Sequence, residues 1–456
     1  MIGKPNKQQS PKIKSKVWLV TVDMGYGHQR ATYPLRPLAF GGVINANNYP
    51  GIPAEDKKTW HDQRKFYEAI SRFKSFPVIG NLIFEVFDEF QKIPQFYPKR
   101  DLSRKSIQVS SAYRLINDKG FGRRLINQLK RRPKLPLVTS FFLTAFMAEI
   151  FDYPGEIYCI ICDADISRAW VSVLPKESRI KYFAPCYRIV ERLKLYGVSE
   201  SRIFFTGFPL PKENIGSERL TILKQDIKNR LVNLDPHRFY LDKYRDTLCK
   251  NLSIRAFPKK ADHPLTITFA IGGAGAQREI GAKILKGLRS RILQNQVRLN
   301  LIAGVHRSAN NYYKENVQKY GLTECLGSSV RILYTPNKME YFKIFNLWLR
   351  KTDILWTKPS ELSFYSGLGL PIIMTQPIGS QEKFNRKYLI NLGAGLDQEN
   401  LKYLDQWLSD WINSGRLAEA AAQGFLEAPK LGTFNIEKIL TKRAIRAKAF
   451  KTISPY

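Results

Sequence analysis

The sequence has few cysteines, few acidic residues and no long apolar run. Its 456 residues include five cysteines, a number too small and too odd for a disulfide framework. Cys159 and Cys162 form a CxxC pair inside an apolar stretch, and the sequence has no second such pair. We therefore expect buried, reduced thiols rather than a metal site, and a protein of the cytoplasm.

No stretch of the sequence approaches the roughly 18 uninterrupted apolar residues that a membrane-spanning helix needs. The basic start of the chain, residues 1–16, is followed by a strand pattern and not by the apolar core of a signal peptide. We therefore predict neither a spanning helix nor a cleaved leader.

The shortage of acidic residues leaves a large positive charge. The chain has 73 Lys and Arg against 39 Asp and Glu, a formal net charge of +34. The excess is concentrated in residues 1–22, 99–132 and 438–451. Such a field attracts nucleic acid or an anionic lipid surface, although a generally basic proteome gives the same composition. No RNA-binding, zinc-finger or helix-turn-helix signature accompanies it, so a nucleic-acid partner is not expected.

Apolar strands alternate with helical patterns along both halves of the chain. The N-terminal half contains KVWLVTVD, LPLVTS, EIYCIICDA, IKYFAPC and RIFFTGFP. The C-terminal half contains LTITFAIGG, VRLNLIAGV, SSVRILYT, DILWT and PIIMT. This alternation predicts an α/β fold with two parallel, doubly wound sheets. Apolar residues at helical spacing between 60 and 130 predict two amphipathic helices, rich in aromatic and basic residues.

We predict four parts of the chain from these patterns. Residues 1–209 form a Rossmann-like domain, and residues 210–262, which lack strand rhythm, form a linker with a helical insertion. Residues 263–420 form a second Rossmann-like domain. Residues 421–456 form a helix that crosses back to the first domain, and a basic tail. The two domains are expected to face each other across a cleft.

Each predicted domain has a glycine-rich turn between its first strand and the next helix. One turn contains Gly25, Gly27 and His28, and the other runs from Gly272 to Gln277. Glycine permits close approach of a ligand to the backbone, and helix N-termini favour anions, so the second turn suits a diphosphate. It lacks the Lys-Ser/Thr pair of a P-loop, which argues against an ATPase. A tight strand-to-helix turn without a ligand also requires glycine.

Polar loops follow two successive strands of the second domain, between Lys358 and Gly395. The second of these loops ends in Gln381, Glu382 and Asn385 on the first turn of a helix. Ligands of open α/β sheets bind outside the carboxyl ends of the strands, where both loops are expected to lie. Polar residues at a helix N-terminus have no ligand in many proteins, so the pattern alone leaves both interpretations open.

The order of residues in this run resembles the glycosyltransferases related to MurG, monogalactosyldiacylglycerol synthase and processive diacylglycerol glucosyltransferase, a family-28-like group. The matching residues are Lys358-Pro359, Gly369-Leu370-Pro371, Gln381-Glu382-Lys383, Asn385 and Gly393-Ala394. The phrase DMGYGHQRA and residues 161–209 add to the likeness, which covers about 17–209 and 263–420. The resemblance implies a GT-B fold and inverting transfer of a sugar from a nucleotide-diphosphate donor.

On the acceptor side, the resemblance implies that Asp23 or His28 is the catalytic base for a hydroxyl group. In the alternative, His28 caps its helix or contacts phosphate without moving a proton. Tyr26 stands where relatives have a glycine, and Ser167 stands where they have a histidine. The implied acceptor-side residues are Gly25, Gly27, Asp163, Ser167 and Trp170.

On the donor side, the resemblance implies a nucleotide-sugar site, and Phe364 stands where relatives have a ribose-binding glutamate. Glu361 lies about one helical turn earlier, and it either substitutes for that glutamate or caps the helix after Ser360. This departure leaves three alternatives open: the nucleotide is UDP, it is a different nucleotide, or it is bound weakly. The implied donor-binding residues are Gly272, Gly273, Ala274, Gly275, Thr335, Met339, Ser360, Glu361, Gln381, Glu382 and Asn385.

The resemblance thus implies a hexosyltransferase that uses a nucleotide sugar as co-substrate, with a UDP-sugar expected, and with no cofactor and no metal. The expected acceptor is a membrane lipid, and the basic and aromatic segments are expected to hold the protein on the inner face of the cell membrane. The alternative is a non-catalytic relative that binds a nucleotide sugar or lipid. Ser167 and Phe364 favour that alternative.

Overall fold

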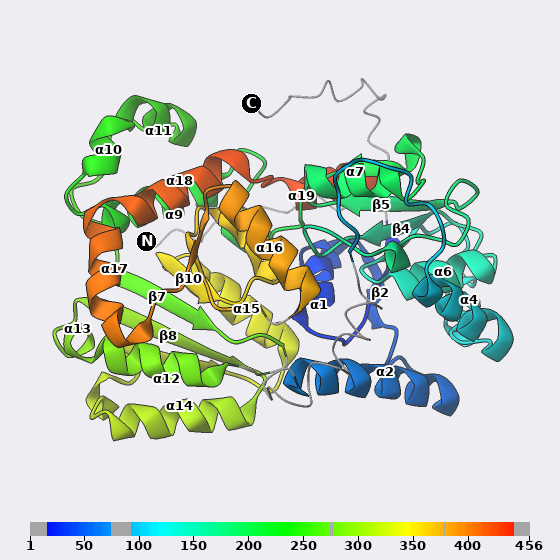
Figure 1. The fold of residues 1–456 in the computed structure, drawn as a ribbon, viewed down its shortest axis with the longest axis horizontal. Coiled ribbons are helices and arrows are strands. Elements are labelled where there is room, and N and C mark those ends of the chain that lie inside the picture. Colours follow the sequence, from blue (N-terminus) through cyan, green and yellow to red (C-terminus); the bar gives the residue numbers. More distant parts are fainter. Residues whose placement is uncertain (1–15, 74–92, 274, 276, 378, 442–456) are drawn as a thin grey trace, which may run out of the picture.

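The computed structural model describes residues 16–73, 93–273, 275, 277–377 and 379–441. The described chain forms two parallel six-stranded sheets, one in each half, with helices packed around them (Figure 1). This confirms the predicted α/β fold of two Rossmann-like domains that face each other, the GT-B arrangement. Ala274, the basic segments 1–15 and 442–456, and residues 74–92 of the predicted aromatic helices lie outside the described residues.

The sheet of the N-terminal domain has the strand order β2-β1-β3-β4-β5-β6. The strands are β1 (Val17–Thr21), β2 (Ala39–Asn45), β3 (Leu137–Thr139), β4 (Ile157–Ile160), β5 (Ile180–Ala184) and β6 (Ile203–Phe205). The helices of this domain are α1 (Tyr26–Thr32), α2 (Ala54–Phe73), α4 (Ile107–Lys119), α5 (Arg123–Leu129), α6 (Phe142–Ile150) and α7 (Tyr187–Leu195), with the short 3-10 helices η1 (Tyr33–Leu38), η2 (Arg168–Trp170) and η3 (Glu200–Arg202).

The sheet of the C-terminal domain has the strand order β12-β11-β10-β7-β8-β9. Its strands are β7 (Leu265–Ala270), β8 (Val297–Gly304), β9 (Val330–Tyr334), β10 (Ile354–Thr357), β11 (Ile372–Met374) and β12 (Gly395–Asp397). Its helices are α12 (Arg278–Gly287), α13 (Arg289–Leu293), α14 (Arg307–Lys319), α15 (Lys338–Leu349), α16 (Ser380–Asn391), α17 (Leu404–Asn413) and α18 (Arg416–Glu427), with the 3-10 helices η4 (Thr323–Cys325), η5 (Glu361–Leu368) and η6 (Leu401–Tyr403).

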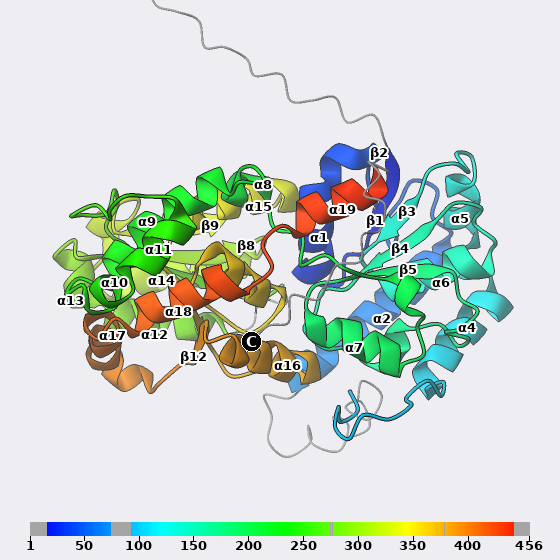
Figure 2. The ribbon, with the colours of Figure 1, turned by 90° about the horizontal axis from the view of Figure 1, so that it is seen from above.

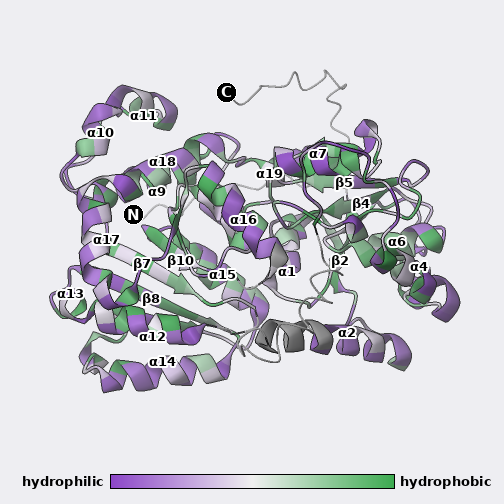
Figure 3. Ribbon diagram, in the orientation of Figure 1, coloured by the Kyte–Doolittle hydropathy of each residue, from purple (hydrophilic) through white to green (hydrophobic). Residues whose placement is uncertain are grey.

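Both sheets are buried between helices, which explains why their strands read as continuous apolar runs. Every residue of β3, β4 and β10 is buried. Parallel strands covered on both faces need apolar side chains at all positions, not only at alternate ones. Figure 3 shows hydrophobic residues concentrated on the strands and hydrophilic residues on the outer helices such as α14. Cys159 and Cys162 are buried and unpaired at the end of β4, as expected.

The segment predicted as a linker is helical and is packed onto the second domain. It contains α8 (Lys212–Ile215), α9 (Thr221–Leu234), α10 (Phe239–Lys243) and α11 (Arg245–Leu252). Arg230 of α9 is 2% exposed, and its guanidinium donates to the carbonyl groups of Leu349, Thr352 and Leu368. Because these bonds satisfy loop carbonyls inside the C-terminal domain, α9 is part of that domain and differs from a free linker.

Within the described ranges, the chain passes between the domains twice, and the two passages lie against each other. The first passage is at Thr206–Leu210, and the second leads into α19 (Gly432–Leu440), which packs on η1 of the N-terminal domain (Figure 2). Asn435 donates to the carbonyl of Thr206 at 2.9 Å, and Thr433 donates to the carbonyl of Leu210. A β-carbon at Gly432 would lie 2.2 Å from the carbonyl oxygen of Phe208, so this crossing requires glycine.

No helix in the described ranges is both long enough and apolar enough to span a bilayer.

Candidate functional site at the domain interface

The two glycine-rich turns meet where the carboxyl ends of β1 and β7 face each other. A β-carbon on Gly273 would lie 3.0 Å from the backbone nitrogen of Tyr26 and 3.2 Å from the α-carbon of Gly25. A side chain at Gly273 would therefore push the domains apart. We call the surface on which the N-terminal and C-terminal domains touch the domain interface. The predicted acceptor-side and donor-side turns are both on it.

Lys358 brings a cation to the donor-side turn. It follows β10, its side chain is 18% exposed, and its Nζ forms an ion pair with Glu382 of α16. Its side-chain carbons occupy the space into which a β-carbon on Gly272 would project. A hydrogen bond from His306 also holds the turn. Its Nε2 lies 2.9 Å from the carbonyl oxygen of Gly273, and since a carbonyl only accepts, Nε2 donates. An ammonium group therefore lies beside the described part of this turn, at the start of α12.

Gln277 closes this turn against the neighbouring strand end. It adopts a left-handed φ of 68°, accepts a hydrogen bond from the hydroxyl of Thr375 at 2.8 Å and donates to the carbonyl of Gln376. Gly275 also has a left-handed φ, 71°, and lies over the ring of His306. The predicted diphosphate turn, which follows β7, is therefore also hydrogen-bonded to the residues that follow β11.

His28 lies on the first turn of α1, with its imidazole facing the N-terminal sheet. Its Nδ1 is 2.6 Å from the carbonyl oxygen of Ser140, and since a carbonyl only accepts, Nδ1 carries the proton. The rings of Phe141 and Trp170 pack beside it, with centroids 4.9 and 6.2 Å away. Burial lowers the pKa of His28 to about 4, so the ring is neutral at pH 7 and Nε2 has a free lone pair for an incoming proton.

Asp23, the other predicted base, is held by two cations. It forms ion pairs with Lys338 of the C-terminal domain and, at 3.4 Å, with Arg64 of α2. Its backbone N–H donates to the side chain of Asn47 at 3.0 Å. Both oxygens of its carboxylate therefore lie against cations in this arrangement. The geometry therefore favours His28 over Asp23 as the base.

Asp163 and Asn385 join the domains by hydrogen bonds. Asn385, which is fully buried, donates to Asp163 Oδ1 at 3.0 Å and accepts from the backbone N–H of Ala164 at 2.8 Å. Asn385 stands on the first turns of α16, and Asp163 follows β4. The nitrogen and the oxygen of the Asn385 side-chain amide thus both form hydrogen bonds with the acceptor-side domain in this arrangement. The resemblance implies a contact with the donor sugar for this residue.

Asp163 has an environment that favours its protonated form. Burial raises the pKa of Asp163 to about 6, and the carboxylates of Glu361 and Glu382 add to the increase. A carboxyl group with such a pKa in the interface exchanges its proton close to neutral pH. This is a property of groups that act in proton transfer.

The pKa of Asp163 predicts how stability depends on pH. An aspartate in the unfolded chain has a pKa near 3.8, so between about pH 4 and pH 6 the folded protein binds more protons than the unfolded chain. The free energy of unfolding should therefore fall as pH rises through this window, by on the order of 2 kcal/mol. Urea unfolding at pH 4, 5, 6 and 7 measures the effect, and Asp163→Asn should remove it. An identical pH dependence in the variant would contradict this assignment.

Glu361 is paired with an arginine of the opposite domain in this arrangement. It begins η5, and the preceding Ser360 makes no side-chain cap. Its Oε1 is 3.1 Å from Nε of Arg30, a buried residue of α1. Phe364, at the position of the usual ribose-binding glutamate, is 2% exposed and stacks on Phe208, with ring centroids 4.9 Å apart. Phe364 is therefore part of the packing at the domain crossing and presents no polar group to a ligand.

The remaining predicted residues line the same region but are engaged with their own neighbours. Thr335 donates to Glu340 at 2.9 Å, and the backbone N–H of Met339 donates to Asn337, which caps α15. Gln381 is half-buried on the first turn of α16. On the acceptor side, Ser167 precedes η2 and is 9% exposed, and Trp170 is 6% exposed beside His28.

Several interface residues were not predicted from the sequence. They are Arg30, Lys338, His306 and Tyr341, and each contacts a partner from a distant part of the chain. Arg30 and Tyr341 are 311 positions apart, so no local pattern signals their pairing. Among the described residues, no group of three or more His, Cys, Asp or Glu side chains is arranged to hold a metal ion.

Comparisons with known proteins give one family and several solved structures of similar shape. A protein-family profile described as "Domain of unknown function (DUF6938)" matches residues 245–437. No curated protein matches the sequence. One similar structure is S. aureus MnaA with UDP, at 13% identity and a TM-score of 0.47, covering 93% of this chain and 95% of that chain.

Two further structures have lower scores. The UDP-GlcNAc 2-epimerase of Methanocaldococcus jannaschii, in complex with UDP-GlcNAc and UDP, has 11% identity and a TM-score of 0.39, covering 93% of this chain and 99% of that chain. Acinetobacter baumannii MurG has 14% identity and a TM-score of 0.39, covering 73% of this chain and 77% of that chain. At these identities the likeness concerns shape, and we base the functional interpretation on the residues of the domain interface.

Proposed function

We propose that this protein is a glycosyltransferase that moves a sugar from a nucleotide-diphosphate donor, with UDP as the nucleotide, to a hydroxyl group. The observation that supports it most is the meeting of the two glycine turns, with Lys358 beside the donor-side turn and His28 on the acceptor-side turn. A diphosphate on the turn at Gly272–Gln277 would lie at the N-terminus of α12, where backbone N–H groups and the helix dipole favour negative charge.

The reaction follows from the placement of these groups. The oxygen of the acceptor hydroxyl forms a bond to the anomeric carbon, and the bond from that carbon to the diphosphate oxygen breaks. The hydroxyl proton passes to Nε2 of His28, and the bonding electrons leave with the nucleoside diphosphate. Attack opposite the leaving group inverts the anomeric configuration. Lys358 and the N-terminus of α12 stabilise the charge that develops on the leaving oxygen.

A bound diphosphate would also improve His28 as a base. Its pKa of about 4 results from burial, and a nearby negative charge raises the pKa of an imidazole. The donor would thereby bring the basicity of His28 closer to neutral pH. Asp163, with a pKa near 6 in the same interface, is a second group able to take up the proton.

We further propose a lipid acceptor at an anionic membrane surface. The support is the net charge of +34 and the exposure of large apolar side chains in the N-terminal domain, including Tyr97 and Ile107. Basic residues around such side chains favour binding to anionic headgroups. The protein would then act at the inner face of the cell membrane.

A second candidate is a protein that binds a nucleotide sugar or lipid without turnover. Two observations favour it. Glu361 is paired with Arg30, and Phe364 fills the packed domain crossing in place of a ribose-binding carboxylate. A donor would then have fewer polar partners on its ribose than in a complete site.

Binding of nucleotide sugars tests the proposal directly. We expect a UDP-sugar, but not the matching GDP-sugar, to raise the melting temperature of the purified full-length protein. At a ligand concentration 100 times the Kd, the gain in free energy of unfolding is about 2.7 kcal/mol. Release of UDP on addition of extracted lipids, with identification of the glycosylated product, then separates the enzyme from the non-catalytic binder.

Lys358→Met provides the residue-level test of the same proposal. Loss of the ammonium group beside Gly272 should weaken binding of UDP and UDP-sugar by ~10-fold or more. Lys351→Met is the matched control, because Lys351 pairs with Asp262 on the surface of the same domain. Equal binding by wild type and Lys358→Met would contradict the placement of the diphosphate.

A further inference from the structure

Arg30 crosses from the N-terminal domain into the core of the domain interface. It lies on α1, is 2% exposed, and makes no contact with bulk solvent through most of its side chain. Its Nη2 donates to the hydroxyl of Tyr341 at 2.7 Å, and its Nε is 3.1 Å from Glu361 Oε1. Tyr341 and Glu361 belong to α15 and η5 of the C-terminal domain. A buried guanidinium of one domain is therefore neutralised by a carboxylate of the other.

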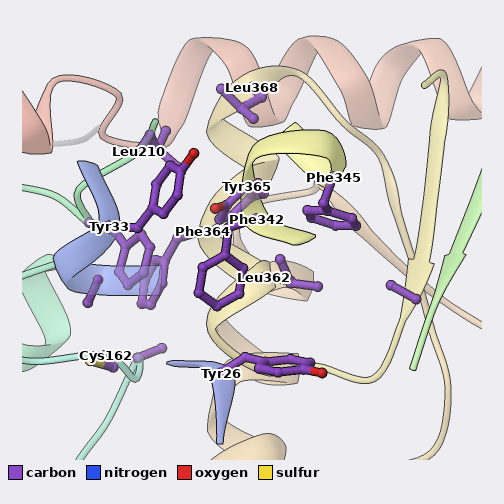
Figure 4. Packing of buried hydrophobic residues seen from close by; sticks show 14 of the residues in the cluster. Tyr26, Tyr33, Cys162, Leu210, Phe342, Phe345, Leu362, Phe364, Tyr365 and Leu368 are labelled. Carbon is purple, nitrogen blue, oxygen red and sulfur yellow. The ribbon is translucent and has the colours of Figure 1, made fainter. Parts of the chain in front are cut away.

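Aromatic rings surround the guanidinium on the remaining sides. The carbon Cζ of Arg30 lies between 4.4 and 6.0 Å from the ring centroids of Tyr26, Tyr341, Phe342, Phe345 and Tyr365. Figure 4 shows four of these rings gathered where α1 meets α15 and η5. Aromatic faces attract a cation, and they exclude the water that would otherwise weaken its ion pair. We call Arg30, Glu361, Tyr341 and this ring cluster the arginine latch.

Tyr26 strengthens the latch from the same helix. Its ring extends into the C-terminal domain, and its hydroxyl accepts a hydrogen bond from the backbone N–H of Val305 at 3.3 Å. A β-carbon on Gly304 would lie 2.7 Å from that hydroxyl. Two residues one helical turn apart, Tyr26 and Arg30, thus anchor α1 to the opposite domain. Another ion pair across the interface, Asp23 with Lys338, is about one quarter exposed on both sides and is expected to contribute less.

The latch also determines whether Glu361 is accessible. One carboxylate oxygen is paired with Arg30, and the other faces α1, where a β-carbon on Gly27 would lie 3.5 Å away. The side chain of Glu361 is 11% exposed. A ribose that needs both oxygens of this carboxylate has no path to them while α1 is in place. Latching and ribose binding at Glu361 therefore exclude each other.

We propose that the arginine latch is an autoinhibitory contact that closes the two domains over Glu361 and must open before a nucleotide sugar can bind fully. This inference rests on the proposed function, because it names Glu361 as the residue that the latch withholds from the donor. Opening rotates the domains about the paired passages near Gly207 and Gly432. Once the ribose occupies Glu361, Arg30 cannot return to it, so the closure that brings His28 to the bound donor occurs without this ion pair.

Arg30→Gln tests the latch. When a binding-competent state is only partly populated, the apparent Kd is raised by the reciprocal of that population. Removing the guanidinium should therefore lower the Kd of a UDP-sugar by ~3-fold or more. Small-angle scattering of the free protein should show a larger radius of gyration. A merely structural role would instead weaken binding of the UDP-sugar.

Two milder variants and one control accompany it. Tyr341→Phe removes the hydrogen bond to Arg30 without emptying the ring cluster, so it should open the domains partially even if Arg30→Gln folds poorly. Arg30→Lys should restore closure in part. The control is Arg230→Gln, which removes a similarly buried arginine within one domain; it should lower stability but leave the radius of gyration and the Kd unchanged.

The outcomes separate this inference from the proposed function. If no variant binds any nucleotide sugar but Arg30→Gln and Tyr341→Phe expand the protein, the latch stands and the proposed function fails. If the wild type binds a UDP-sugar and both variants keep its radius of gyration and Kd, the latch is wrong and the proposed function stands. Tighter binding by wild type than by both variants would also overturn the latch.

Discussion

Replacement of His28 by glutamine is expected to abolish sugar transfer while leaving donor binding intact. The proton on Nδ1 is fixed by the carbonyl of Ser140 at 2.6 Å, so Nε2 is the nitrogen that receives the acceptor proton. Glutamine keeps a polar side chain of similar length but cannot take up a proton. Loss of general base catalysis lowers rates by ~10²–10⁴-fold. The decrease should appear in kcat, with the Kd of the UDP-sugar changed by less than ~2-fold.

His237→Gln is the matched control for this variant. His237 is exposed between α9 and α10 of the C-terminal domain, far in sequence from the interface turns. The His237→Gln variant should retain wild-type kcat and donor affinity. Near wild-type turnover by His28→Gln would show that the base is elsewhere, and Asp163→Asn would then be expected to carry the defect. Circular dichroism and melting temperature should be compared first, since His28 also packs on Phe141 and Trp170.

The largest loss of stability is expected from Asp165→Ala. Asp165 is fully buried, and its two oxygens accept hydrogen bonds from Arg192 at 2.8 and 2.9 Å and from Arg188 at 2.8 Å. Arg192 is itself 0% exposed. Removal of the carboxylate leaves that guanidinium buried without its anion, which costs about 3–5 kcal/mol. Urea unfolding at pH 7 measures this loss as a decrease in the midpoint at unchanged m-value.

An exposed ion pair provides the comparison. Asp242, with its side chain 64% exposed, pairs with Arg238 on the first turn of α10. Asp242→Ala should lower the free energy of unfolding by less than about 1 kcal/mol. Similar losses in the two variants would mean that the network around Asp165 is solvated. Asp165→Asn keeps the shape of the side chain, so its loss in free energy of unfolding should lie between those of Asp165→Ala and Asp242→Ala.

Asp163 and Asp165 illustrate how far the sequence can assign roles. They are two residues apart in the same loop, and both are acidic residues following an apolar strand. The structure makes one a partner of Asn385 at the domain interface and the other the anion of a buried arginine cluster. The arginines come from α7, more than 20 residues later. Because that contact is tertiary, the local sequence gives no means of telling the two aspartates apart.

The two sheets and their glycine turns were predictable for a different reason. Parallel strands buried on both faces need continuous apolar runs, and tight turns need glycine. Both features are therefore encoded by residues that are close together in the sequence. Two strands were not predicted, β2 and β12, and both are edge strands. β2 contains Gly41 and Gly42 at left-handed φ values, and its pairing with β1 shifts register. β12 has only three residues. Most residues of both strands are exposed or half-buried, so neither has the apolar pattern of an inner strand.

The arrangement of the site depends mainly on contacts between the domains. Of the residues predicted for it, Asp23, Gly273, Glu361 and Asn385 each touch the opposite domain. The resemblance implied ligand contacts for them, whereas in this closed arrangement they hold the domains together. A polar side chain at the interface contacts either a ligand or the opposite domain, depending on the distance between the two domains. No sequence pattern in either domain encodes that distance.

The return of the chain to the N-terminal domain has a consequence for synthesis. α19 packs on η1, and the carbonyls of Thr206 and Leu210 accept their hydrogen bonds from Asn435 and Thr433, near the C-terminal end of the described chain. N-terminal domains usually fold first as the chain emerges from the ribosome. Here that domain lacks one of its helices until residue 440 has emerged, by which time the whole second domain has been translated. The first domain must therefore persist through most of translation with an uncovered surface beside η1, and its completion is the last step of folding.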